Sequence, residues 1–508
     1  MELKLTRETI PTTETVFDGV QEQSLELDYI LPDYCPDIFR LIRCDIEPVI
    51  TDSSLNGSRL SYEVRCNIRI LYGGGDGSAI RSVEQHRSYV GTVELGTDIS
   101  SPEISLTPRT ERVDLRAVNK RRIDLRGAVS VKILVTRQRE QEVISDASGM
   151  NIQLKRTPVR YAAARLTAEK NFSIEESIDL GAARSDISDI ISCRCRAAEC
   201  ESRLISGKLL VKGEAEVRLL CTGGDAPAPI SFSLSYSQML DMDGLDDSYS
   251  SAVTAEVISC EVTVSDSRTL RCEAELRLRC RAVKAASAMI AEDAFSTLYP
   301  CTVETAEIQT GQIPAVYDES LKHTAVIARG EEVPQDIFAM WSTAKNINAR
   351  TGEDGRSVTI SGMLVCSMAA RDKSGSIIMP DRDEAFEETI VLPDDISGAT
   401  ISAEVSVRDT SYDISAANVL TARTDMAVRL SVYSSASVRA VTDISADTSV
   451  KKERDGDYAI KLYFGAENED IWDIAKRYST SVEAVMEENE LSGERLESGG
   501  MLLIPIIS

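Results

Sequence analysis

Apolar and polar residues alternate in short runs along most of the chain, and the alternation recurs at intervals. In residues 62–72 every second position is apolar or aromatic: Tyr62, Val64, Cys66, Ile68, Ile70 and Tyr72. A period of two is typical of a β-strand with one buried face. Similar runs occupy residues 215–221 and 362–370, and further ones occupy 123–135, 270–283 and 419–432. With turn signals between the runs and little helical period, the pattern predicts antiparallel β-sandwich or barrel-like modules.

One sequence pattern occurs three times along the chain. An Asp-Ile pair followed by an alternating strand and a turn occurs at Asp37-Ile38, Asp189-Ile190 and Asp336-Ile337, at intervals of 152 and 147 residues. Such self-similarity indicates repeated structural units. We therefore expect three β modules, at residues 20–155, 156–300 and 318–446. The stretch 303–319 has weaker periodicity and contains Gly311 and Pro314, so it is expected to link the second and third modules.

A glycine-rich segment follows the alternating strand of the first unit, at residues 73–77, and turn residues recur at 222–225 and 371–375. A phosphate cradle would need a following helix whose N-terminus faces the anion. No helical pattern follows any of the three. Because Gly and Asp readily adopt positive φ, the recurrence favours a hairpin turn.

The last fifty residues have a different pattern. Tyr458, Ile460 and Leu462 alternate as a short strand, and residues 501–506 form another. Between them, Ile471, Ile474, Ala475 and Tyr478 have helical spacing behind Asp470 as N-cap, and a second helix is predicted to begin at Thr480, with Val482, Val485 and Met486 facing inward. The predicted order is strand, helix, helix, strand. Residues 447–456, rich in charge, are expected to be a solvated linker.

The sequence Asp470-Ile471-Trp472-Asp473-Ile474-Ala475, with Asn489-Glu490-Leu491 and Leu502-Leu503-Ile504-Pro505 at matching spacing, resembles the LysM family. The resemblance implies a βααβ LysM domain at 457–508. LysM domains generally bind glycans containing N-acetylglucosamine in a shallow groove between the loop before the first helix and the loop after the second. This implies candidate ligand or partner residues Asn468, Glu469, Asp470, Ile471, Trp472, Asn489, Glu490 and Leu491.

Two features of this domain bear on its ligand. Where the family usually reads Gly-Asp-Thr, this chain has Asn468-Glu469-Asp470, and residues 457–508 hold 11 acidic and 4 basic residues, a net charge of −7. Peptidoglycan also carries carboxylates, so the charge favours a protein partner. Trp472 has two interpretations: an aromatic of the helix core, or, one position off the Ile471 and Ile474 stripe, a partly exposed anchor of a binding patch.

The domain order as a whole resembles the SipL-type spore coat morphogenetic proteins, in which repeats of the domain of unknown function 3794 precede a C-terminal LysM domain. The resemblance implies a non-enzymatic scaffold or adaptor in spore coat assembly, placed in the mother cell at the forespore surface. It further implies that the LysM domain binds the coat morphogenetic ATPase SpoIVA or another coat protein. Binding of peptidoglycan in cell wall or spore cortex is the alternative.

Composition narrows the partners. The formal charge is −26, which opposes binding to nucleic acid or to an anionic membrane surface. The N-terminus has no apolar run of signal-peptide length and no segment approaches a membrane span, so we expect a cytoplasmic protein without membrane insertion. The twelve cysteines are then expected to be reduced.

Catalytic motifs are missing from the sequence. The two histidines, His86 and His323, lie in different modules without motif context. Cys193, Cys195 and Cys200 are close in sequence, but their spacing is not that of paired zinc ligands. No nucleophile elbow, Walker loop or zincin helix is present. We expect no enzyme activity, no cofactor and no metal.

Overall fold

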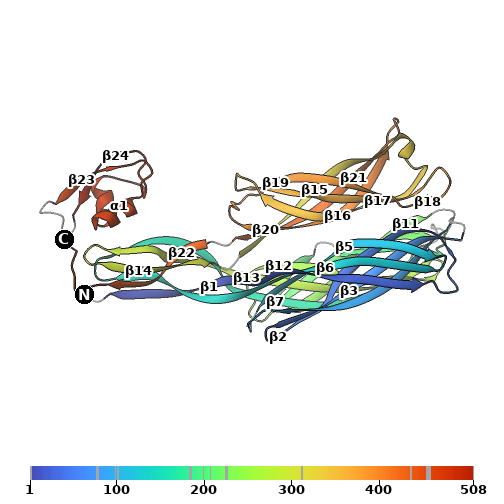
Figure 1. The fold of residues 1–508 in the computed structure, drawn as a ribbon, viewed down its shortest axis with the longest axis horizontal. Coiled ribbons are helices and arrows are strands. Elements are labelled where there is room, and N and C mark those ends of the chain that lie inside the picture. Colours follow the sequence, from blue (N-terminus) through green and yellow to red (C-terminus); the bar gives the residue numbers. More distant parts are fainter. Residues whose placement is uncertain are drawn as a thin grey trace.

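The computed structural model describes residues 3–75, 79–97, 99, 102–181, 186–197, 200–205, 207–223, 227–310, 313–434, 437–452 and 459–506. Most of these residues form antiparallel strands, and a small C-terminal domain holds two helices between two strands (Figure 1). The predicted mainly β fold with a terminal βααβ domain is confirmed.

Each repeat contains two facing three- or four-stranded sheets. The first repeat pairs β1, β6 and β5 in one sheet and β2, β3 and β4 in the other. Their bounds are β1 Lys4–Ile30, β2 Ile38–Asn56, β3 Arg59–Gly74, β4 Ala79–Glu94, β5 Glu103–Asn119 and β6 Arg122–Ser148. Alternating residues of both sheets, among them Leu60, Ile68 and Ile133, meet in one core. The first repeat is thus a β-sandwich, as the period-two pattern predicts.

The second and third repeats have the same plan. In the second, β7, β13 and β12 form one sheet and β8, β9, β10 and β11 the other; in the third, β15, β21 and β20 face β16, β17, β18 and β19. The bounds in the second are β7 Ile152–Asp179, β8 Asp189–Ala197, β9 Glu201–Ile205, β10 Lys208–Thr222, β11 Ala228–Asp241, β12 Ser250–Asp266 and β13 Thr269–Ser296. Those in the third are β14 Cys301–Gln309, β15 Ile313–Arg329, η1 Gly330–Glu332, β16 Asp336–Thr351, β17 Ser357–Arg371, β18 Ile377–Ile378, β19 Asp381–Val391, β20 Thr400–Ile414, β21 Val419–Ser434 and β22 Ser437–Ala446.

Six strand segments continue beyond the sandwiches and form what we call the hairpin stalk: residues 4–16, 137–148, 152–164 and 284–296, with β14 and β22. They pair as β1 with β6, β7 with β13, and β14 with β22. All six contribute to one apolar cluster, whose members are Ile10, Val143, Val159, Tyr161, Ala288, Ile290, Ile308 and Ala440. Figure 1 shows these strands running along the long axis toward the C-terminal domain.

The three sandwiches also meet one another. A second small cluster contains Leu71 of β3, Leu220 of β10 and Ala369 of β17. The alternating runs of the three repeats end at residues 72, 221 and 370, and each of the three named residues lies one position before that end. The cluster therefore brings equivalent positions of the three repeats into contact. The guanidinium of Arg194 lies 3.9 Å from the ring centroid of Trp341, which adds a contact between the second and third repeats.

The strands differ from the expected module limits in three places. Residues 303–319, predicted to be a link, lie mostly in β14 and β15, because their apolar side chains pack in the stalk, where neighbouring repeats supply the partners. Strand β7 runs through the expected boundary at 155 and 156, and the ladder of β1 with β6 starts at Lys4, ahead of residue 20.

The turns support the hairpin interpretation. Strands β3 and β4 pair antiparallel across the glycine-rich segment, where Gly75 has φ +65°. In the third repeat Gly375 has φ +84°, and the carboxylate of Asp372 accepts a hydrogen bond from the Ser374 amide at 2.9 Å. Residues 76–77 and 224–225 of the predicted turns lie outside the described residues.

None of the twelve cysteines, all within the described residues, forms a disulfide, and the sulfurs of Cys193 and Cys260 lie 3.9 Å apart. Burial raises the pKa of the Cys44 thiol to about 12. Within the described part of the chain, no cluster of His, Cys, Asp and Glu is arranged to hold a metal ion, and none of its helices has the length and apolarity of a membrane span.

Candidate functional site

The C-terminal domain is built as its sequence pattern predicts. It consists of β23 Ile460–Gly465, α1 Ile471–Tyr478, α2 Val482–Glu488 and β24 Gly500–Pro505, with β23 and β24 antiparallel. Ile471, Ile474, Ala475 and Val485 are buried in its core. Tyr458, assigned to the first strand by its alternation, lies outside the described residues.

Both helices begin at capping residues. Asp470 caps α1 by accepting a hydrogen bond from the Trp472 amide at 2.9 Å. Ser481, and not the predicted Thr480, caps α2 through the Ala484 amide. Thr480 is instead fully buried, and its hydroxyl donates to the Pro505 carbonyl, tying the helix start to β24.

The loop before α1 holds Asn468, Glu469 and Asp470. Asn468 is exposed and has φ +63°. The Glu469 carboxylate turns toward the domain, accepting from the Tyr463 hydroxyl at 2.7 Å and the Ala466 amide at 3.0 Å. Desolvation opposes its charge, but these hydrogen bonds and Arg477 outweigh desolvation and lower the pKa of Glu469. Glu469 therefore braces the loop from within.

The segment after α2 holds Asn489, Glu490 and Leu491. The Asn489 amide group donates to the carbonyls of Val485 and Leu503, and its oxygen accepts from the Leu503 amide. Leu491 packs against the core, whereas Glu490 is exposed with φ +53°. Asn489 and Leu491 hold this segment in place, and Glu490 presents its side chain to solvent.

Trp472 and Asp470 contact the hairpin stalk. The Trp472 ring is 6% exposed and packs edge-on against Phe295 of β13, with 4.9 Å between centroids. Its Nε1 donates to the Asp293 carboxylate at 2.9 Å. The Asp470 carboxylate accepts from Lys155 of β7 at 2.6 Å. The interpretation of Trp472 as buried is thus the one the structure shows, and part of its burial comes from another domain.

Further contacts complete this junction. Lys476 of α1 binds the same Asp293 carboxylate at 2.5 Å. Lys452, within the stretch expected to be a solvated linker, donates to the Ser296 carbonyl and the Ser479 hydroxyl. The described end of that linker is therefore held between stalk and domain. One face of α1 is covered by the chain itself, a fact that the local sequence does not signal.

The outer face of the two-stranded sheet remains uncovered. Leu462, Phe464 and Met501 are 62, 70 and 65% exposed, and Phe464 lies directly opposite Met501 across the strands. Ile460 belongs to the same face and is 43% exposed. Four large apolar side chains on one side of so small a sheet form an apolar patch of the kind that marks interaction sites. The sequence prediction missed it because alternation alone does not tell which face of a strand is covered.

Comparison with known proteins agrees with this geometry. Residues 466–505 match the LysM domain family. No curated protein and no solved structure matches the chain. The chain thus carries a LysM domain, a class of module that binds peptidoglycan glycans or takes part in protein interactions, on a scaffold of three repeated β-sandwiches.

Proposed function

We propose that this protein is a non-enzymatic adaptor whose LysM domain binds another protein in spore coat assembly. The observation that carries the proposal is the exposed apolar face of Leu462, Phe464 and Met501 on β23 and β24. Exposed apolar clusters contribute binding energy chiefly in contacts with protein surfaces. The resemblance of the domain order to SipL-type proteins suggests the coat morphogenetic ATPase SpoIVA as the partner.

Glycan binding is the second candidate, since a LysM domain is present. Two observations favour a protein partner over a glycan ligand. The Glu469 carboxylate is committed to Tyr463 and Ala466, and Asp470 to Lys155, so both are occupied within the chain. The domain is also acidic, which opposes approach to a polymer bearing carboxylates. Asn468 and Glu490 remain exposed beside the two loops and could still contact a sugar.

The test compares the sheet face with the loops in the full chain. Phe464→Asp places a charge at the centre of the apolar face, and Asn468→Ala alters the loop without touching it. We expect Phe464→Asp to abolish co-elution with purified SpoIVA and Asn468→Ala to leave it intact. Both variants should keep the circular dichroism of the parent, because both side chains are exposed. Asn468→Ala should melt slightly lower than the parent, because Asn468 has φ +63°, a conformation that alanine tolerates less well than asparagine.

Sedimentation with purified peptidoglycan is measured on the same proteins. If the parent sediments with peptidoglycan, loses this with Asn468→Ala, and never co-elutes with SpoIVA, the glycan function replaces the adaptor proposal. Co-elution that survives Phe464→Asp would reject the sheet face as the contact.

A further inference from the structure

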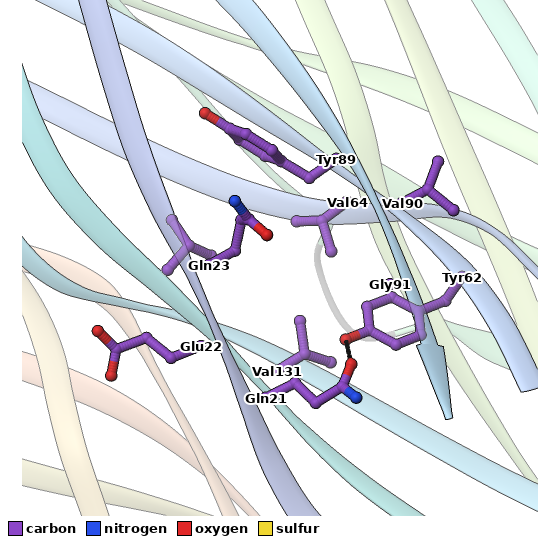
Figure 2. A pocket seen from close by; sticks show the side chains of 10 residues that line it. Gln21, Glu22, Gln23, Tyr62, Val64, Tyr89, Val90, Gly91 and Val131 are labelled. Carbon is purple, nitrogen blue, oxygen red and sulfur yellow. Dashed lines mark hydrogen bonds between the residues drawn. The ribbon is translucent and has the colours of Figure 1, made fainter. Parts of the chain in front are cut away.

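The first sandwich has an open seam between its two sheets. A pocket of about 250 Å³ lies between strand β1 of one sheet and strand β4 of the other. Figure 2 shows Gln21, Gln23, Tyr62 and Tyr89 around it, with the tyrosine hydroxyl of Tyr62 bound to the Gln21 side chain. The remaining lining residues are Glu22, Val64, Val90, Gly91, Val129 and Val131.

The same seam is closed in the other two repeats, where β7 lies against β11 and β15 against β19. Strand pairing identifies the equivalent positions. Strands β6, β13 and β21 are the central strands of the equivalent sheets. Six positions after the first buried residue of each strand lie Val129, Leu276 and Met426, respectively. Their partners on the neighbouring strands β1, β7 and β15 are Gln23, Phe172 and Leu321, respectively. Repeats two and three thus have an apolar side chain where the first repeat has an exposed glutamine.

The facing edge strand also has an equivalent position in each repeat. Seven residues before Leu71, Leu220 and Ala369 of the shared cluster lie Val64, Gly213 and Gly362. Their partners on the edge strand are Tyr89, Tyr236 and Phe386. An aromatic ring therefore borders the seam in all three repeats.

In the second repeat the two positions contact each other. The ring of Phe172 lies 5.2 Å from that of Tyr236, tilted by 54°, a favourable aromatic geometry. Phe172 and, in the third repeat, Leu321 pack against their sandwich cores. Tyr89 in the first repeat has no such neighbour on β1, because Gln23 occupies the position. The pocket is lined by Gln23 and Tyr89, which hold the positions of Phe172 and Tyr236 in the second repeat.

The chemistry of the lining excludes charged ligands. Valines form the apolar part, and the polar groups nearest the tyrosines are the neutral amides of Gln21 and Gln23. The one carboxylate, that of Glu22, points away from the two tyrosines in Figure 2. Val90 lies at the mouth and is 72% exposed. Among the described residues β4 pairs only with β3, and β1 pairs with β6 and, through the isolated bridge of Thr12 to Thr310, with the segment after β14. Beside the pocket the Gln21 side chain donates to the Thr92 carbonyl of β4 at 2.9 Å, so the strand edge available to a further strand is that of β1.

We propose that this pocket binds an aromatic side chain, that of a phenylalanine, presented by an extended segment of a partner protein. The segment lies along the free strand edge, as in peptide recognition by strand addition. Its ring packs against Tyr89 as the ring of Phe172 packs against Tyr236. The site belongs to the first repeat alone, which gives the three-repeat scaffold a second contact far in sequence from the LysM domain.

The probe is the acetylated and amidated pentapeptide Thr-Thr-Phe-Thr-Thr, with Thr-Thr-Ala-Thr-Thr as its control. Binding to the full chain is followed by saturation-transfer NMR on the peptide protons and by calorimetric titration. We expect the phenylalanine peptide to bind at least tenfold more tightly than the alanine peptide. Equal binding of the two, or binding of chitotriose at this site in place of the peptide, overturns the proposal.

Two variants fill the pocket with the side chains of the other repeats, Gln23→Phe and Gln23→Leu. Each is expected to weaken binding of the phenylalanine peptide at least tenfold while leaving the melting temperature unchanged or higher. Gln138→Phe is the matched control, because Gln138 is exposed on β6 in the stalk, and it should bind like the parent. Binding that is unchanged in both filling variants rejects the pocket. None of these variants touches the LysM domain, so the outcome is independent of SpoIVA binding.

Discussion

The indole Nε1 of Trp472 donates a hydrogen bond to the carboxylate of Asp293 at 2.9 Å, across 179 residues of chain. The bond joins the first helix of the LysM domain to the far end of strand β13. Lys476 binds the same carboxylate and Phe295 packs against the indole. The domain is therefore held on the stalk by a small polar and aromatic contact, which leaves its sheet face directed elsewhere.

Replacing Asp293 should loosen this contact without unfolding either part. Asp293→Ala leaves the buried indole N–H without its acceptor, a cost of about 1–3 kcal/mol for an unsatisfied donor. We expect the ¹⁹F NMR signal of 5-fluorotryptophan at position 472 to move toward its solvent-exposed position, while the Trp341 signal stays in place. Glu490→Ala, a change of an exposed carboxylate in the same domain, should move neither signal.

The same contact should depend on pH at both extremes. Burial opposes the charge of Asp293, but hydrogen bonds from Lys476 and Trp472 outweigh burial and hold its pKa below the usual 3.8. Burial likewise disfavours the Lys155 ammonium, but its bond to Asp470 raises the Lys155 pKa above the usual 10.5. A lowered acid pKa adds stability above 3.8 that is lost as pH falls through the folded value, and a raised lysine pKa adds stability below 10.5 that is lost as pH rises.

The docked state should thus be constant between these limits and weaken outside them. A pH titration of the Trp472 ¹⁹F signal measures this directly. In Asp293→Asn the change of the Trp472 signal at acid pH should disappear, and its change at alkaline pH should remain. A signal that titrates near neutral pH would contradict the assignment of the contact to these two pairs.

Much of the β fold could be predicted from local pattern. The strands around Ile68, Leu219 and Val428 alternate over most of their length because one face of each is buried in its own sandwich. The LysM helices were predictable because Asp470 and the Ile471 and Ile474 spacing are local signals. Such signals depend only on neighbours in sequence.

The stalk and the docking of the LysM domain could not be predicted in this way. Ile10, Val143 and Ile308 are buried by partners from other repeats, and the residues around them are largely polar or charged. Phe295 and Asp293 give no sign of their contact with Trp472 in the sequence around them. Both features depend on contacts between segments far apart in the chain, to which hydrophobic period is insensitive.

Asn489, predicted as a ligand residue, should prove more important for stability than for binding. Its side chain makes three hydrogen bonds, to Val485 and to both backbone groups of Leu503. Asn489→Ala leaves the Leu503 amide unpaired, so we expect a loss of about 1–3 kcal/mol in the unfolding free energy of the LysM domain. Chemical denaturation followed by the ¹⁹F signal of 5-fluorotryptophan at position 472, which is separate from that of Trp341, measures it. The neighbouring exposed Glu490→Ala should change stability by less than about 0.5 kcal/mol.

One buried arginine contributes to the packing of the first repeat on the second. Arg277 of β13 is 2% exposed, and its guanidinium donates to the carbonyls of Ile50 and Thr51 in β2 at 2.7 and 2.8 Å. Arg277→Leu removes both donors while keeping apolar volume, which leaves the two carbonyls without their donors, whereas Glu169 keeps its ion pair with Arg279. We expect a destabilisation of about 1–3 kcal/mol for each carbonyl left without a donor, seen as a lower melting temperature by calorimetry.

Arg279 provides the control for this change. It lies two residues further on the same strand, also binds Glu169, and has a side chain that is 40% exposed. Exposed ion pairs contribute about 0–1 kcal/mol, so Arg279→Leu should melt close to the parent. Equal effects of the two substitutions would mean that the loss at Arg277 comes from Glu169 alone and not from the carbonyls of the first repeat. A lower melting temperature for Arg277→Leu alone would show that hydrogen bonds to backbone carbonyls of the first repeat stabilise its contact with the second repeat.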